Sequence, residues 1–130
     1  MDLHYNAICI KVQRSGKGGR MTYTVSYHPE AEVEAAELPL NIKVKYDKVV
    51  EKLEVDPTKL REPHTKSLGD GLFELRTMGT DIARGIWIYQ SGRNIIILRV
   101  FIKKSQKVSR HDIELAKSRL EELLNEIKNT

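Results

Sequence analysis

The stretch LFELRTMGTDIARGIWIYQSGRNIIILRVFIK, residues 72–103, contains three apolar runs separated by short turn sequences. We expect one strand from each run: 72–77, 82–90 and 94–103. The runs are rich in β-branched and aromatic residues, and Gly79 and Gly92 stand in the turns between them. The third run is apolar almost without interruption, which is typical of a central strand buried on both faces.

The sequence on either side of this region predicts a further strand and three helices. These elements are a strand at 22–27, a short acidic helix that begins at Pro29 and is ended by Pro39, and helices at 41–55 and 110–128. The strand alternates apolar and polar side chains, and the longer helices repeat apolar residues every three or four positions. Ser109 and Asp112 resemble a capping box at the start of the last helix.

The predicted order, β-α-α-β-β-β-α, indicates the α+β class, a mostly antiparallel sheet with helices packed on it. A chain of 130 residues suits one main domain. We divide it into residues 1–20, an N-terminal extension of uncertain structure in which 7–12 is a candidate strand, and residues 21–130, the main domain. Residues 57–70 are polar and rich in turn formers, so we expect an irregular loop there.

Charge is distributed unevenly along the chain, although the net charge is only +4. Residues 76–110 carry eight basic side chains and one acid, whereas residues 28–56 carry eight acids and four lysines. A domain that is basic on one side and acidic on the other would approach a polyanion in one orientation. The alternative is that both segments are ordinary solvated faces.

The composition excludes several classes of protein. The single cysteine, Cys9, excludes an intrachain disulfide framework and a multi-cysteine zinc site. No apolar stretch reaches the roughly 18 residues of a membrane helix, and the N-terminus lacks the pattern of a secretory signal. We therefore expect a cytoplasmic protein that has no membrane partner and needs no metal or cofactor.

Four short motifs follow one another in the second half of the chain: GLFELR at 71–76, RGIWIY at 84–89, FIKKSQK at 101–107 and IELA at 113–116. Each is weakly specific alone, but the ordered set resembles the phage-derived, HigB-like branch of the RelE/ParE toxin superfamily. The resemblance covers residues 22–124. It implies a RelE-like microbial RNase fold and a toxin of a type II toxin–antitoxin system.

The resemblance also implies an activity and partners. Such toxins are metal-independent endoribonucleases that usually cut messenger RNA, commonly on the ribosome. Their partner is a cognate antitoxin, often a helix-turn-helix DNA-binding protein encoded next to the toxin.

Cleavage of RNA without a metal requires cations that stabilise a pentacoordinate phosphorane, together with a general base and a general acid. Arg84 matches the arginine that contacts the scissile phosphate in relatives, so it is our first catalytic candidate. Arg76 is the second. It shares a strand face with Glu74, and a purely structural charge pair explains it equally well.

Further basic residues are expected to position the RNA backbone. Lys103 and Lys104 point to opposite sides of their strand, so one of them should face the RNA, and Lys104 is assigned to the catalytic group. The remaining RNA-binding candidates are Lys103, Lys107, Arg99, Phe101 and Arg110. Phe101 would stack on a base, unless it is a core residue.

The general base is the least defined part of this hypothesis. Relatives often place a tyrosine or histidine at the start of the last helix, and His111 lies close to that position. A helix N-terminus would keep its imidazole neutral and able to accept a proton. Several relatives carry extra lysines on the strand of Phe73, where this chain has Glu74, and that departure puts efficient cleavage in question.

Two other functions remain open. A ParE-like toxin would inhibit gyrase without cutting RNA, and the lack of an evident acid–base pair favours it. A decayed toxin or plain interaction domain would retain only its binding to the antitoxin.

Overall fold

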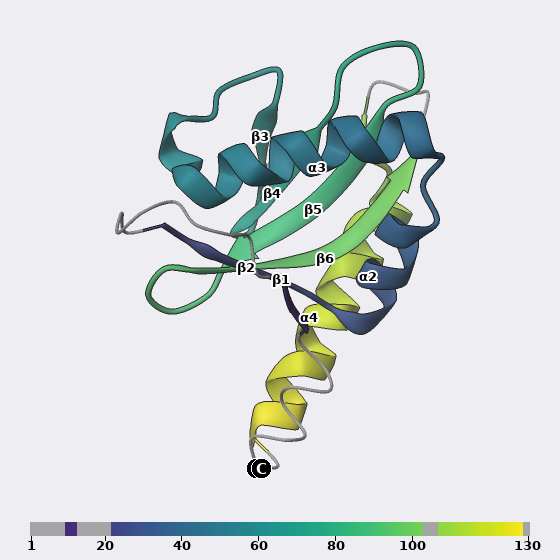
Figure 1. Ribbon diagram of the computed structural model, residues 1–130. Helices are drawn as coiled ribbons and strands as arrows, with labels where there is room; N and C mark the ends of the chain where they lie inside the picture. The colour runs from purple at the N-terminus through teal and green to yellow at the C-terminus, as the bar shows by residue number, and fades with distance from the viewer. Residues whose placement is uncertain (1–9, 13–21, 103–106, 129–130) are drawn as a thin grey trace.

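The computed structural model describes residues 10–12, 22–102 and 107–128 (Figure 1). Its elements are β1 Ile10–Val12, β2 Thr24–Tyr27, α2 Pro29–Ala36, α3 Leu40–Val55, the 3-10 helix η1 Pro57–Lys59, β3 Thr65–Gly69, β4 Leu72–Arg76, β5 Ala83–Tyr89, β6 Asn94–Ile102 and α4 Arg110–Lys128. Within these residues, the helices are too short or too polar to cross a membrane.

The described strands form one six-stranded sheet in the order β1-β2-β6-β5-β4-β3. All neighbouring pairs are antiparallel except β2 and β6, which run parallel. A parallel pair needs a long crossover, and the chain between these two strands provides it with α2, α3 and three strands. The expected α+β class with a mostly antiparallel sheet is confirmed, and the architecture is consistent with a RelE-like fold.

Both faces of the central strand β6 are buried, as its apolar sequence predicts. Ile95 and Ile97 pack in a first hydrophobic cluster with side chains of α2 and α3, whereas Ile96 and Leu98 pack in a second cluster with α4. In Figure 1, α3 crosses one face of the sheet and α4 lies on the other. Each buried Leu or Ile contributes roughly 1.5–3 kcal/mol, so these clusters hold the three layers together.

The helix ends agree with the local sequence signals. The Asp112 N–H donates to Ser109 Oγ at 3.1 Å, and that hydroxyl donates to Asp112 Oδ2 at 2.7 Å. His28 caps α2 by accepting the N–H of Glu30 on Nδ1 at 3.1 Å. Helix α2 ends at Ala36, three residues before Pro39, which becomes the cap residue of α3.

Residues 57–70 differ from the sequence-based expectation, which is wrong for this stretch. They contain η1 and the edge strand β3 instead of an irregular loop. β3 pairs with β4 across a tight turn in which Gly69, Asp70 and Gly71 have φ of 89°, 57° and 80°. A mostly exposed edge strand needs few apolar side chains, so the segment TKSLG lacks the alternation by which strands are recognised.

Part of the N-terminal extension joins the sheet. β1 lies within the candidate strand 7–12 and pairs antiparallel with β2, with Lys11 opposite Ser26. The division of the chain at residue 20 stays a prediction, because most of the extension lies outside the described residues.

Candidate functional site

The strand register places the two candidate catalytic arginines next to each other. Arg76 on β4 is the register partner of Arg84 on β5, and Arg84 is the partner of Phe101 on β6. Ile86, two residues after Arg84, packs in the cluster with α4, and side chains two residues apart in a strand share a face. The arginines therefore lie on the α4 face of the sheet, as a common site requires.

A buried carboxylate links these arginines. Glu74 Oε2 lies 3.4 Å from Arg84 Nη1 and 3.5 Å from Arg76 Nη2. Glu74 and Arg84 are each only 2% exposed, whereas the Arg76 side chain is 22% exposed. One carboxylate against two guanidiniums leaves a net positive charge here, and of this trio Arg76 is the member that presents charge to solvent. Glu74 departs from the lysines expected on this strand, but its position gives it a clear role as a counter-ion of both arginines.

Burial governs the electrostatics of Arg84. Loss of hydration lowers the pKa of its guanidinium, the charge of Glu74 opposes that change, and the charge of Arg76 adds to it, so the pKa lies below its ordinary value. The group still carries its charge at neutral pH. A phosphate approaching this face would meet Arg76 first and would reach Arg84 only after a side chain moves.

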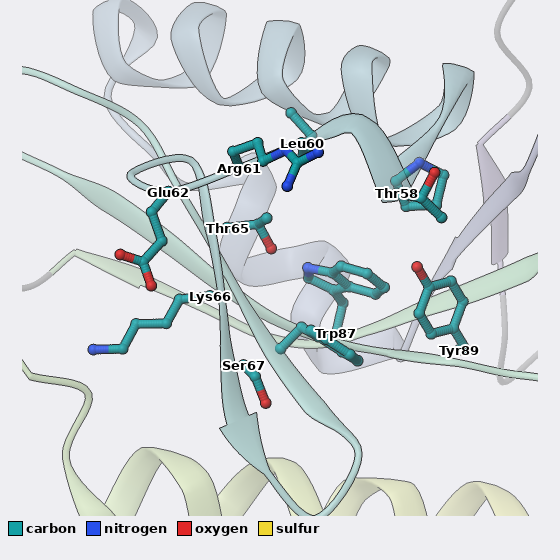
Figure 2. Close-up of a pocket in the computed structure, with 11 residues that line it drawn as sticks. Thr58, Leu60, Arg61, Glu62, Thr65, Lys66, Ser67, Trp87 and Tyr89 are labelled. Atoms are coloured by element: carbon teal, nitrogen blue, oxygen red, sulfur yellow. The ribbon is translucent and has the colours of Figure 1, made fainter.

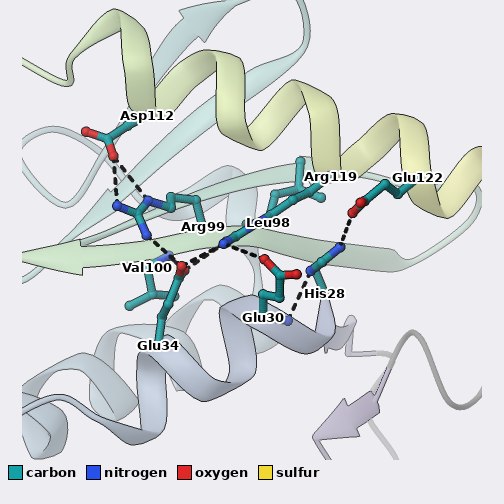
Figure 3. A network of polar contacts seen from close by, with 9 residues as sticks. All are labelled: His28, Glu30, Glu34, Leu98, Arg99, Val100, Asp112, Arg119 and Glu122. Atoms are coloured by element: carbon teal, nitrogen blue, oxygen red, sulfur yellow. Dashed lines mark hydrogen bonds and ion pairs between the residues drawn. The ribbon is translucent and has the colours of Figure 1, made fainter.

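Arg99 and Phe101, two of the expected RNA ligands, are already engaged inside the molecule. Arg99 Nη1 donates to Glu34 Oε2 at 2.6 Å, and its Nε donates to Asp112 Oδ1 at 3.1 Å (Figure 3). The same guanidinium lies over the Phe101 ring, 5.2 Å from its centroid. Phe101 is 9% exposed and belongs to the second core cluster, so in this conformation its ring is not open to a base.

Arg119 on α4, which was not a candidate, is the centre of the network in Figure 3. It donates to Glu34 at 2.8 and 2.9 Å, to Glu30 at 3.0 Å and to the Leu98 carbonyl at 2.9 Å. Glu30 and Glu34 of α2 are thus paired with arginines of β6 and α4. Here Arg99 of the basic segment meets Glu34 of the acidic segment, and the separation of charge over the whole domain stays a prediction.

The start of α4 carries the accessible candidates. Lys107, Arg110 and His111 are exposed, and Arg110 Nε lies 3.9 Å from Glu114 on the next turn. Asp112, which binds Arg99, connects this helix end to β6. Lys103 and Lys104 lie outside the described residues.

His64 was not among the site residues predicted from the sequence. The N–H of Arg76 donates to the His64 carbonyl at 2.9 Å, which places His64 at the end of β3 beside Arg76. The residue is half-buried, and within the described part of the chain its Nδ1 has no hydrogen-bond partner. No sequence signal indicated this position, because β3 itself was not recognised.

These observations define a class of protein: a small α+β domain with a RelE-like fold and two arginines in register on the α4 face of its sheet. The sequence model of the phage-derived Gp49-like protein family matches residues 34–121, about two thirds of the chain, and the chain belongs to this family. The family is toxin-like and related to the RelE and HigB toxins of type II toxin–antitoxin systems, which implies a cognate antitoxin as partner. No curated protein matches the chain.

Proposed function

We propose that this chain is the toxin of a type II toxin–antitoxin pair and that it cuts messenger RNA during translation without a metal ion. The observation that supports this most is the pair Arg76 and Arg84, two guanidiniums in register on neighbouring strands. Guanidinium forks match phosphate oxygens and remain charged at any physiological pH. Membership in a family related to RelE and HigB supports the same reading.

In the proposed reaction the ribose 2′-hydroxyl attacks the adjacent phosphorus, and the bond to the 5′ oxygen breaks. The products are a 2′,3′-cyclic phosphate and a free 5′-hydroxyl. Arg76 binds a non-bridging oxygen directly, while Arg84 adds positive potential from beneath and exchanges its contact with Glu74 for one with the phosphorane. Glu74 holds both guanidiniums in place before the substrate arrives.

Proton transfer has two histidine candidates. His111 is exposed at the start of α4. His64 is half-buried and directly beside Arg76. One of them removes the 2′ proton, and Lys104, which lies outside the described residues, is assigned in this proposal as the donor to the leaving 5′ oxygen.

The RNA backbone is held in this proposal by Lys103, Lys107 and Arg110. Arg99 and Phe101 contribute only if RNA displaces Arg99 from Glu34 and Asp112. The antitoxin partner is proposed to be a helix-turn-helix protein.

Induction of the protein in a bacterial host, followed by mapping of transcript ends, tests the proposal. We expect growth arrest and new 5′ ends within translated codons. Arg76→Ala and Arg84→Ala should abolish both effects. Arg93→Ala is the matched control, because Arg93 lies at the β5–β6 turn over the Tyr23 ring, away from the proposed site. If Arg76→Ala and Arg84→Ala fold and cut as well as the unchanged protein, the proposed site is wrong.

The burial of Arg84 is the observation that favours a non-nuclease alternative, either a ParE-like gyrase inhibitor or a decayed toxin. Intact transcripts with broken DNA after induction would indicate gyrase poisoning. Normal growth with retained antitoxin binding would indicate a decayed toxin.

A further inference from the structure

A pocket of about 330 Å³ lies on the face of the sheet opposite the arginine pair (Figure 2). Its floor is formed by Phe73 and Trp87, which pack on the α3 side. The loop that follows η1 closes one side, and β3 closes another. This volume is at the lower end of the range for ligand pockets, so it suits a small ligand.

The floor and wall of the pocket are aromatic. The rings of Phe73 and Trp87 stack at a centroid distance of 4.7 Å, and Tyr89 meets Phe73 at 5.6 Å and Trp87 at 5.0 Å, both edge to face. Tyr89 remains 41% exposed although it is a large aromatic side chain. An exposed ring beside a rigid aromatic cluster is a surface on which a planar ligand can stack.

A polar atom inside this aromatic cluster lacks a partner. Trp87 is 1% exposed, and within the described residues its indole N–H donates to no acceptor. In Figure 2 the indole nitrogen is on the side of the ring that faces Thr65 and the loop of Arg61. A buried donor without an acceptor is destabilising, so a ligand with an in-plane acceptor would be favoured here once a neighbouring side chain moves and opens the nitrogen to the pocket.

The rim of the pocket is polar. Arg61 carries a positive charge, Glu62 carries a negative charge, and Thr58 and Thr65 provide hydroxyl groups. The Lys66 side chain extends away from the aromatic rings in Figure 2. Thr65 Oγ1 donates to the Glu74 carbonyl at 2.8 Å, so that hydroxyl keeps its acceptor capacity for a ligand. An anionic group at the rim would be attracted by Arg61.

We propose that this pocket binds a nucleotide: the base stacks on Tyr89 and accepts the Trp87 indole N–H, and the phosphate lies against Arg61. A purely apolar ligand would leave the indole N–H unsatisfied, and a cationic ligand would be repelled by Arg61. The same chemistry is offered by a free mononucleotide and by an unpaired nucleotide of an RNA strand. The site is independent of the proposed cleavage site, because it lies on the opposite face of the sheet.

The chain contains a single tryptophan, so Trp87 reports on its own pocket. We would titrate the full chain with AMP, GMP, CMP and UMP, and with ribose 5-phosphate as a probe that has phosphate but no base. Saturable quenching of fluorescence by at least one mononucleotide, together with a shift of the sole indole N–H resonance, supports the proposal. Ribose 5-phosphate should bind at least about tenfold more weakly, because it cannot stack.

Arg61→Ala and Lys59→Ala form a matched pair of variants. Both remove one exposed positive charge, Lys59 from the last position of η1 and Arg61 from the loop that follows, but only Arg61 lines the pocket. We expect Arg61→Ala to weaken nucleotide binding roughly ten- to hundredfold, the effect of losing a charged hydrogen bond, and Lys59→Ala to change it less than about twofold. Equal losses in the two variants, or no saturable response to any nucleotide at millimolar concentration, would overturn the proposal.

A second arm separates the two sources of the nucleotide. Single-stranded tetranucleotides that bind at least about tenfold tighter than mononucleotides and compete with them identify an RNA strand as the source, while equal affinity identifies the free nucleotide. Arg76→Ala should bind nucleotides as the unchanged protein does. If the protein cuts RNA but binds no nucleotide, only the proposal of a nucleotide pocket is overturned. If it binds nucleotides but cuts no RNA, only the cleavage proposal is overturned.

Discussion

At the scale of single residues, Glu74 explains how two arginines can lie in register on neighbouring strands. Like charges opposite each other in a sheet repel, and Arg84 has almost no access to water that would weaken this repulsion. The shared carboxylate oxygen, 3.4 and 3.5 Å from the two guanidiniums, compensates that repulsion. The positive site therefore depends on an acid within it.

Replacement of Glu74 by glutamine tests this dependence. We expect Glu74→Gln to lower the free energy of unfolding by about 3 kcal/mol, because it removes the carboxylate charge that faces the buried Arg84 guanidinium. Urea unfolding followed by circular dichroism measures the loss. The double variant Glu74→Leu/Arg84→Met removes both charges and should be more stable than Glu74→Gln. A loss below about 0.5 kcal/mol for Glu74→Gln would contradict the assigned role.

The two histidines give a second prediction at this scale, which rests on the proposed cleavage. We expect His64→Ala to lower the cleavage rate about a hundredfold or more, as the loss of a general base does, because His64 is next to Arg76. His111→Ala should lower it less. The pH–rate profile of purified protein on a model RNA separates the roles, since loss of the base removes the acidic limb. A larger effect of His111→Ala would return the base to the start of α4.

At the scale of elements, the sequence predicted correctly those helices and strands that have strong local signals. Helix α4 spans Arg110–Lys128 as predicted, and β4 to β6 end within a residue or so of the expected bounds, because their apolar runs and turn glycines are local features. β3 was missed because an exposed edge strand is specified by its pairing with β4 and not by its own side chains. Because side chains alternate between the two faces of a strand, the sequence is consistent with Arg76 and Arg84 on the same face of the sheet. It does not predict that the Arg84 side chain is buried.

The N-cap of α4 provides a prediction for a single element. Ser109→Ala removes the acceptor for the Asp112 N–H and should reduce stability by about 1 kcal/mol. Ser118→Ala is the matched control, because Ser118 is exposed in the middle of the same helix and alanine is favoured there. Thermal unfolding of both variants checks the prediction. Equal stabilities would show that Ser109 does not cap the helix.

At the scale of the whole molecule, Glu34 connects three elements, α2, β6 and α4, that lie far apart in the sequence. From α2 it accepts hydrogen bonds from Arg99 on β6, from the Val100 N–H and from Arg119 on α4. The acidic helix and several of the arginines can be recognised in the sequence, but their pairing cannot, because ion pairs across 65 or 85 residues depend on the finished packing. The network therefore connects α2 to the helix whose start carries the proposed RNA ligands.

The contacts of the Glu34 carboxylate make the stability of the fold depend on pH. Burial raises the pKa of Glu34, but hydrogen bonds from Arg119 and the Val100 N–H, with the charges of the nearby arginines, outweigh it and hold the pKa below its ordinary value. A carboxyl group with a lowered pKa in the folded state stabilises the fold above its unfolded pKa, and that stability is lost as the pH falls through the folded pKa. We expect Glu34→Gln to be less stable than the unchanged protein at neutral pH and to lose less stability on acidification.

Asp70→Asn is the control variant. The exposed ion pair of Asp70 with Lys117 also lowers the pKa of the Asp70 carboxyl, but salt screens this ion pair. The free energy of unfolding, measured at successive pH values in about 0.5 M salt, should therefore vary less with pH in Glu34→Gln than in the unchanged protein. Its dependence on pH should be the same in Asp70→Asn as in the unchanged protein. If Glu34→Gln shows the same pH dependence as the unchanged protein, Glu34 does not link α2 to α4.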